Sequence, residues 1–216
     1  MSLCVVVGVG PKIGSSVGKA FAEDGYDVAL VSRNEAHLKP YAEEIDAAGR
    51  TVYTVGFDAA TPQATKAGFE KIQQAAGTPD VVVNTPAVMP MFTYSQLTPQ
   101  IADEMFQVML YGAMNTVNAV LPSMREAGKG TLLFVGGGFG VDPSVKRAPH
   151  SLGKAALRHY AHGLHLELKE ENIHAATVTV YRPVEAGDDM KKCAATFVDL
   201  HNEPSGSWSW EKEYGN

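Results

Sequence analysis

The sequence predicts a doubly wound α/β fold, built on one parallel sheet of about seven strands with helices on both faces. Three observations predict it. Short apolar runs alternate with longer helical patterns along the chain. The first run, residues 3–7, is continuously apolar, as expected of a strand buried on both faces. A glycine-rich turn follows it directly. Strictly alternating strands and helices favour a parallel sheet with right-handed crossovers.

The elements are expected in a regular order, and several helical patterns end at a glycine such as Gly25, Gly49 or Gly77. The expected strands are residues 3–7, 28–31, 51–55, 81–83, 131–135 and 175–180, with a possible last strand at 208–210. The expected helices are residues 15–23, 35–48, 64–76, 101–124, 152–168 and a short one near 189–200. Since no internal repeat or linker interrupts this order, residues 1–216 are expected to form a single domain.

Composition narrows the function classes. The hydrophobic fraction of 45% and the charged fraction of 19% are ordinary for a globular protein. A formal net charge of -6 argues against a nucleic-acid binder, which needs a basic face. Cys4 and Cys193 are the two cysteines, and such sparse usage fits a reducing compartment. No signal peptide and no apolar run of membrane-spanning length are evident, so a cytoplasmic protein is expected.

The turn after the first strand is a candidate phosphate site. It consists of Gly8-Val9-Gly10-Pro11-Lys12-Ile13-Gly14 and leads into a helix. Glycines at such a turn let a pyrophosphate approach the backbone, and the helix N-terminus supplies oriented N–H donors. The candidate cofactor-binding residues here are Gly8, Gly10, Lys12, Ile13 and Gly14. The alternative is a plain strand-to-helix turn.

The end of the second strand favours NADP(H) over NAD(H). Proteins that bind NAD through this kind of fold usually carry an acid there, which holds the ribose hydroxyls. This chain has Ser32 and Arg33 instead. The Arg33 guanidinium is suited to a charge-assisted contact with a 2′-phosphate. The alternative is a solvated arginine at the start of a helix.

The order of these motifs resembles the short-chain dehydrogenase/reductase family over nearly the whole chain. The first and last glycines of the family turn match Gly8 and Gly14, while Lys12 stands at the middle glycine. Asp58, after the third strand, is similar to the family aspartate that contacts adenine. The segment Asn84-Thr85-Pro86-Ala87 is similar to the family Asn-Asn-Ala-Gly segment beside the cofactor, with the first Asn (Asn84) and the Ala (Ala87) matching. The resemblance implies a dinucleotide cofactor and a small-molecule substrate.

The same resemblance weakens at the catalytic positions. Of the family Tyr-x-x-x-Lys pair, Lys154 remains and His150 replaces the tyrosine. Three glycines, 136–138, stand where the family serine lies, and the family asparagine falls on Met109. The loop after the sixth strand, 182–187, lacks the family threonine. One of the four catalytic positions is therefore retained.

His150 and Lys154 are the candidate catalytic residues. An imidazole titrates near neutral pH and can exchange a proton with a substrate oxygen. The reach of His150 from the backbone is shorter than that of a tyrosine. Lys154 lies one helical turn further on the same face, and its ammonium would lower the pKa of His150. The alternative is that His150 merely starts a helix and Lys154 binds the cofactor ribose.

Other side chains are expected to pack rather than to react. Tyr94 and Tyr111 border the expected site, and Tyr160 is assigned to the core or an interface. Three histidines recur along one helix, but no acidic or cysteine cluster accompanies them, so no metal site is expected. These histidines are His159, His162 and His165.

Three functions stay open from the sequence. The first is an NADP(H)-dependent oxidoreductase acting on a carbonyl or an alcohol. The second is a non-catalytic dinucleotide-binding or partner protein, and the third is an interaction protein whose altered glycine turn has closed the cofactor site. Substrate contacts are expected in loops 88–97, 139–149 and 184–190. Family precedent implies a homodimer or homotetramer through helices 101–124 and 151–168, with no nucleic-acid or membrane partner.

Overall fold

The computed structural model describes residues 2–47 and 49–216, and it confirms the predicted fold class. The described residues form a seven-stranded sheet in the order β3-β2-β1-β4-β5-β6-β7, and every neighbouring pair is parallel. The strands are β1 (Leu3–Val7), β2 (Asp27–Ser32), β3 (Val52–Gly56), β4 (Val81–Asn84), β5 (Gly130–Val135), β6 (Ile173–Val180) and β7 (Glu211–Tyr214). The strand order reverses between β1 and β4, which is where ligands bind in sheets of this kind.

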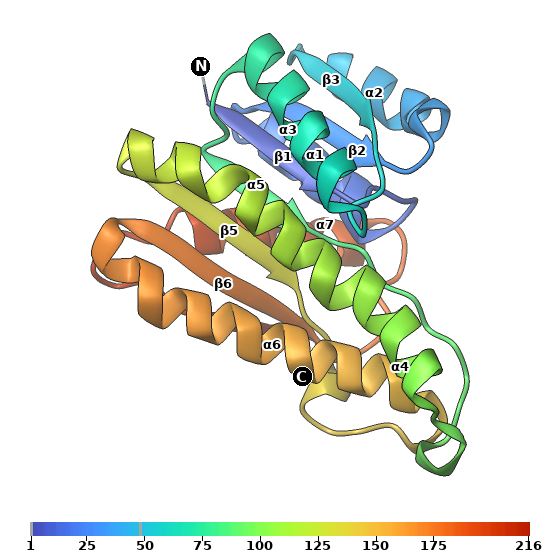
Figure 1. Ribbon diagram of the computed structural model, residues 1–216. Coiled ribbons are helices and arrows are strands. Elements are labelled where there is room, and N and C mark those ends of the chain that lie inside the picture. Colours follow the sequence, from blue (N-terminus) through green and yellow to red (C-terminus); the bar gives the residue numbers. More distant parts are fainter. Residues whose placement is uncertain (1, 48) are drawn as a thin grey trace.

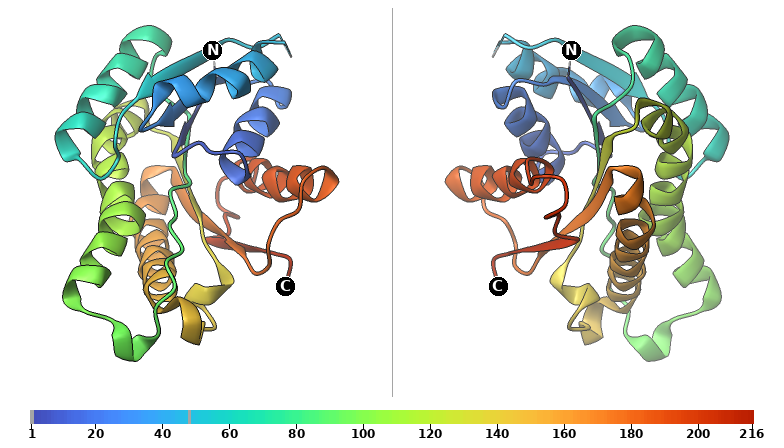
Figure 2. Two further views of the ribbon diagram at one scale, coloured as in Figure 1. Left: turned by 90° about the vertical axis from the view of Figure 1, so that its right-hand side faces the viewer. Right: turned by 90° about the vertical axis from the view of Figure 1, so that its left-hand side faces the viewer.

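Two helical layers cover the sheet (Figures 1 and 2). One face carries α1 (Ile13–Glu23), α2 (Lys39–Asp46) and α7 (Asp188–His201), and the other carries α3 (Pro62–Ala76), α5 (Gly112–Ala127) and α6 (Ala148–Leu168). Each face encloses its own apolar cluster, because the central strands are buried on both sides. This double burial explains why residues 3–7 lack any alternation of apolar and polar side chains.

The long helix expected at residues 101–124 is interrupted. It consists of α4 (Pro99–Phe106), a π-helical segment η3 (Gln107–Tyr111) and α5, which follow one another along one side of the molecule (Figure 1). Met109, at the family asparagine position, lies inside the π-helical segment and is fully buried. A change of period over five residues is too small to detect in a hydrophobic pattern, and π-helical turns often mark functional sites.

Boundaries of other elements also differ from expectation. The segment expected as helix 35–48 begins as a 3-10 turn, η1 (Glu35–Leu38), because the Asn34 side chain accepts a hydrogen bond from the Ala36 N–H. α2 then ends at Asp46, and the last expected residue, 48, lies outside the described residues. The helix expected from residue 152 begins at Ala148, so His150 lies in its first turn.

The last strand, β7, begins just after the expected residues 208–210. Trp208 and Trp210 instead stack on two histidines of neighbouring elements. The ring of Trp208 lies 5.0 Å from that of His174, and the ring of Trp210 lies 4.2 Å from that of His162. These aromatic contacts anchor the segment that leads into β7. Among residues 2–47 and 49–216, no helix has the length and apolarity that a membrane crossing requires.

Candidate functional site

A cavity of about 690 Å³ opens where β1, β4, β5 and β6 end at their carboxyl edge. Its volume lies within the range of roughly 300–1,000 Å³ that is typical of small-molecule and cofactor sites. Its wall combines the glycine turn after β1, the segment after β4, the glycines after β5, the start of α6 and the loop after β6. The lining residues are Gly8, Gly10, Pro11, Lys12, Ile13, Gly14, Thr85, Ala87, Met89, Val135, Gly136, Gly137, Gly138, Phe139, Arg147, His150, Lys154, Val180, Tyr181, Arg182, Pro183, Val184 and Met190.

The glycine turn is held against the segment after β4. Gly8 has φ +85°, and a Cβ there would lie 2.6 Å from the Pro86 side chain. The Thr85 hydroxyl donates to the carbonyls of Val7 and Gly8, at 2.9 and 2.8 Å. A side chain at Gly8 would therefore clash as well as disfavour the backbone conformation. These contacts fix the path of the chain into α1.

The turn is open toward the cavity. A Cβ at Gly10 would meet no atom within 4 Å. Lys12 is exposed at the N-cap of α1, where helix N–H groups and the helix dipole favour an anion. Five predicted cofactor residues of this turn line the cavity together, namely Gly8, Gly10, Lys12, Ile13 and Gly14. The turn has therefore not collapsed onto the space that a pyrophosphate needs.

Three other predicted cofactor residues lie along the same sheet edge but outside the cavity lining. Arg33 is exposed just after β2. Asp58 is exposed just after β3 and accepts a hydrogen bond from the Ala60 N–H at 3.0 Å. Asn84 ends β4 with a buried side chain that donates to Thr116 Oγ1 at 3.3 Å. A fourth predicted residue, Ala87, does line the cavity.

His150 is buried in the first turn of α6, with 6% of its surface exposed, and it lines the cavity. Its Nδ1 lies 2.7 Å from the Val88 carbonyl oxygen. Because a carbonyl can only accept, Nδ1 carries the proton in this bond, and Nε2 has a free lone pair in the neutral ring. Burial lowers the pKa of His150, and the nearby Lys154 and Arg147 lower it further, while the Val88 bond opposes them.

Lys154 lies one turn further along α6 and is almost completely buried. Its Nζ donates to the Val135 carbonyl at 2.5 Å, at the end of β5. Burial lowers the pKa of Lys154 to about 8. The two predicted catalytic residues are thus brought together on one wall of the cavity, as their spacing in the sequence indicates.

The glycines after β5 leave little room for side chains. A Cβ at Gly136 would lie 2.6 Å from Thr177 Oγ1, and a Cβ at Gly138 would lie 2.6 Å from the Tyr181 ring. A Cβ at Gly137 would meet only the flexible Lys154 side chain, at 3.3 Å. Of the three positions, Gly137 is the one where a serine would fit. Gly137 is therefore the glycine that corresponds most directly to the family serine.

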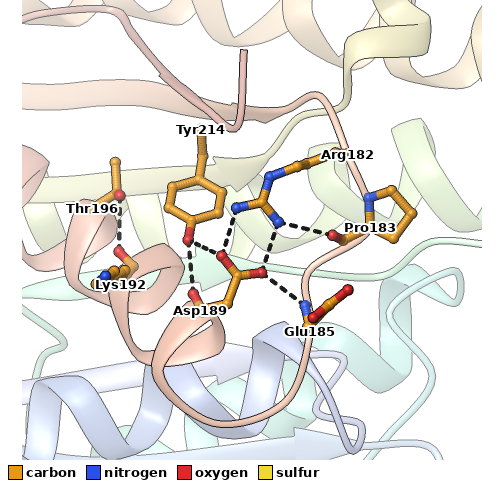
Figure 3. Close-up of polar contacts among 7 residues, drawn as sticks. All are labelled: Arg182, Pro183, Glu185, Asp189, Lys192, Thr196 and Tyr214. Atoms are coloured by element: carbon orange, nitrogen blue, oxygen red, sulfur yellow. Dashed lines mark hydrogen bonds and ion pairs between the residues drawn. The ribbon is translucent and has the colours of Figure 1, made fainter.

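The sequence analysis gave no site role to Tyr181 and Arg182, two cavity residues directly after β6. Arg182 forms a bidentate ion pair with Asp189, at 2.8 and 2.6 Å, and Tyr214 of β7 donates to the same carboxylate at 2.6 Å (Figure 3). The Glu185 N–H also donates to that carboxylate, at 2.8 Å. These bonds tie the loop after β6 to the start of α7 and to the last strand.

Arg147 was also missed, although it lies within the loop 139–149 that was expected to contact substrate. It is half-buried immediately before α6, and it lines the cavity. A single basic residue in a loop carries no distinctive pattern. Its place in the site depends on a hydrogen bond to the Met89 carbonyl, 58 residues away in the chain.

The side chains set aside in the sequence analysis do not line the cavity. Tyr111 packs near Phe106, and Tyr160 packs near Phe134 of the core. Tyr94 is exposed in a short 3-10 turn, η2 (Tyr94–Gln96). Among the residues that the structure describes, no group of three histidine, cysteine, aspartate or glutamate side chains is arranged to hold a metal ion.

The short chain dehydrogenase family model matches residues 2–185, which is most of the chain. The chain belongs to the short chain dehydrogenase family. This membership confirms the resemblance noted from the glycine turn and the lysine of α6. His150 and Lys154 stand at the positions where the resemblance predicts the family tyrosine and lysine.

Relatives extend this assignment. An uncharacterized oxidoreductase of Mycobacterium tuberculosis is 34% identical over 168 residues, covering 77% of this chain and 64% of the relative, so the chain spans less than two thirds of that protein. The NADPH-dependent 1-acyldihydroxyacetone phosphate reductase of Saccharomyces cerevisiae is 29% identical over 207 residues, covering 94% of this chain and 68% of the relative. The short-chain dehydrogenase of Rhodopseudomonas palustris shares the fold, with a TM-score of 0.89 and 22% identity over 100% of this chain and 98% of that one.

Proposed function

We propose that this chain is an NADP(H)-dependent oxidoreductase that interconverts a carbonyl compound and an alcohol by hydride transfer. The observation that carries the proposal is the cavity itself, which is lined by the open glycine turn, His150 and Lys154 together. In the reducing direction, a carbonyl compound, NADPH and a proton give an alcohol and NADP⁺. In the oxidising direction, the alcohol and NADP⁺ give the carbonyl compound, NADPH and a proton.

The described residues fit a dinucleotide. In this proposal the pyrophosphate lies against the Gly8–Gly14 turn and Lys12, and the 2′-phosphate lies against Arg33. Asp58 contacts the adenine, the segment from Asn84 to Ala87 lies beside the cofactor, and Lys154 holds the ribose. A second support is the yeast relative, which is named as NADPH-dependent. The absence of an acid at the end of β2 favours NADP(H) over NAD(H).

His150 handles the proton. Bound nicotinamide would supply or accept the hydride. With Nδ1 engaged by Val88, the neutral His150 ring presents Nε2 as an acceptor, which suits removal of the hydroxyl proton during alcohol oxidation. When His150 is protonated, the same nitrogen donates to the carbonyl oxygen during reduction. Lys154 keeps a positive charge close to this oxygen while its Nζ is anchored by Val135.

A second candidate function is a dinucleotide-binding protein without turnover. The observation that favours it is the loss of three of the four family catalytic groups, with His150, Gly137 and Met109 at their positions. Such a protein would bind NADPH as the enzyme does but would not oxidise it with any carbonyl compound. Turnover in a screen of carbonyl compounds therefore separates the two functions.

We also assign the protein to the cytoplasm as a homodimer or homotetramer. The unpaired, buried Cys4 and Cys193 support a reducing compartment. Leu152 and Leu166 are large exposed apolar side chains on α6, one of the two helices expected to mediate assembly. A single monomer-sized species in size-exclusion chromatography at micromolar concentration would exclude the oligomer.

The cofactor assignment is tested by titrating the protein with NADPH and with NADH while following nicotinamide fluorescence. We expect NADPH to bind more tightly than NADH. In Arg33→Ala the affinity for NADPH should fall by about tenfold or more, because a charge-assisted phosphate contact is lost, while NADH binding stays unchanged. Arg50→Ala is the control. Arg50 is an exposed arginine just before β3, at the edge of the sheet opposite to the edge where Arg33 follows β2.

Two outcomes would contradict the cofactor assignment. If the protein bound neither NADPH nor NADH, both candidate functions would be excluded, the oxidoreductase and the dinucleotide-binding protein without turnover. Equal loss of NADPH and NADH affinity in Arg33→Ala would show that Arg33 does not contact the 2′-phosphate.

A further inference from the structure

The charged side chains that line the cavity are all basic. They are Lys12, Arg147, Lys154 and Arg182, with the titratable His150 and Tyr181 beside them, and among the described residues no aspartate or glutamate lines the cavity. The whole chain, by contrast, carries a formal net charge of -6. Basic groups concentrated in a concave wall focus a positive potential, which favours anionic ligands. The proposed function assigns Lys12 and Lys154 to the cofactor, which leaves Arg147 and Arg182 for another ligand.

The basic groups have different partners. Lys12 lies at the N-cap of α1, in the turn assigned to the pyrophosphate. Lys154 donates to the Val135 carbonyl, and Arg182 is paired with Asp189. Arg147 forms no ion pair with any residue in the described ranges 2–47 and 49–216. It is therefore the cavity arginine whose charge has no carboxylate partner.

Arg147 is held beside the proposed proton-transfer group. Its Nη1 donates to the Met89 carbonyl at 3.1 Å, and His150 Nδ1 donates to the preceding carbonyl, Val88, at 2.7 Å. Two consecutive carbonyls thus hold the two basic side chains next to each other at the start of α6. A guanidinium has five N–H donors, so most of those on Arg147 remain available.

Resting on the proposed function, we infer that Arg147 binds a carboxylate of the substrate, so that the substrates are short oxo acids and the corresponding hydroxy acids. A planar guanidinium matches a carboxylate in geometry as well as charge. Arg147 directly precedes the helical turn that carries His150, and the two side chains bond consecutive carbonyls. A carboxylate on Arg147 and the reacting oxygen at His150 therefore lie within a few bonds of each other. The apolar side chains of Met89 and Phe139 also line the cavity, and the Phe139 ring lies 6.1 Å from that of His150.

Binding of a carboxylate also affects His150. Arg147 is one of the charges that lower the pKa of His150. A carboxylate on Arg147 offsets that charge, which favours the protonated ring. The anionic substrate would thereby help to produce the proton donor that its own reduction needs.

The test compares butanoate with butanamide, which have the same size but differ in charge. Their affinities are measured by calorimetry on cofactor-free protein, and again in the NADPH complex through nicotinamide fluorescence. We expect wild-type protein to bind butanoate at least about tenfold more tightly than butanamide, a difference of about 1.4 kcal/mol. Arg147→Met should abolish this preference, and Arg147→Lys should retain part of it. Lys146→Met is the matched control, because Lys146 is an exposed neighbouring cation outside the cavity lining.

Equal affinity of wild-type protein for the two probes would overturn the inference, whether or not any variant folds. So would a preference that survives in Arg147→Met or disappears in Lys146→Met. The cofactor-free measurement separates the two proposals. A carboxylate preference without NADPH binding would support the anion site at Arg147 and exclude the proposed function. NADPH binding without a carboxylate preference would support the cofactor assignment and exclude the anion site.

Discussion

At the scale of single residues, the hydrogen bond from His150 to Val88 decides which chemistry the ring can perform. Because Nδ1 is the donor in this bond, Nε2 is the nitrogen left to exchange a proton with a ligand. Burial and two nearby cations lower the pKa of His150 below its usual value. At neutral pH the ring is therefore mainly neutral and is set up to accept a proton, which favours alcohol oxidation over carbonyl reduction.

The pH profile of turnover follows from this pKa. Oxidation needs neutral His150, so its rate should fall as pH drops through a value below the usual 6.5 or so. Reduction needs the protonated ring, so its rate should fall as pH rises through the same value. With a substrate found by screening, His150→Phe should lower kcat about 10²- to 10⁴-fold and remove this inflection, while NADPH binding is unchanged. His159→Phe on the exposed side of α6 is the control. An unchanged profile in His150→Phe would assign the proton step to another group.

Residues differ in how far the sequence reveals them. His150 and Lys154 were predicted because their spacing of four places them on one helix face, and the family lysine marks the pair. Arg147 was not singled out, because its role depends on carbonyls at residues 88 and 89, which are distant in the chain. Interactions of this kind leave no local pattern.

At the scale of elements, the wall of the site is set by the close approach of the β5 turn to α6. Gly140 ends the 3-10 turn η4 (Gly138–Gly140), and a Cβ there would lie 2.7 Å from the Lys154 carbonyl carbon. Backbone therefore packs directly on backbone at the turn of α6 that carries Lys154. The loop after β6, another part of the cavity wall, is fixed by the ion pair of Arg182 and Asp189 and by the Tyr214 hydroxyl (Figure 3).

Gly140→Ala should destabilise the protein by about 1–3 kcal/mol, because the methyl group must displace helix backbone rather than a flexible side chain. Gly163→Ala, in the helix α6 against which Gly140 packs, is the matched control. A Cβ at this exposed position meets no atom within 4 Å, so the substitution should raise stability by about 0.5–1 kcal/mol. The measurement is the free energy of unfolding in urea. Similar changes for both variants would show that the contact of Gly140 with α6 does not determine the packing there.

At the scale of the whole molecule, the parallel sheet and its two helical layers were predicted from the alternation of strands and helices, since each long segment has one clear period. The carboxyl edge of such a sheet is a general ligand site, so the position of the cavity was also expected. The π-helical segment η3 and the bonds that fix the loop after β6 were not predicted. Both arise from packing between distant segments, such as Gly153 against Met109 and Tyr214 against Asp189.

The most direct test of the account is a crystal structure of the protein with NADPH bound. We expect the pyrophosphate against the Gly8–Gly14 turn and the 2′-phosphate at Arg33. The reactive face of the nicotinamide should be turned toward His150 Nε2, with room between them for a substrate oxygen within hydrogen-bond reach of that nitrogen. NADPH bound outside this cavity, or with its nicotinamide turned away from His150, would contradict the account.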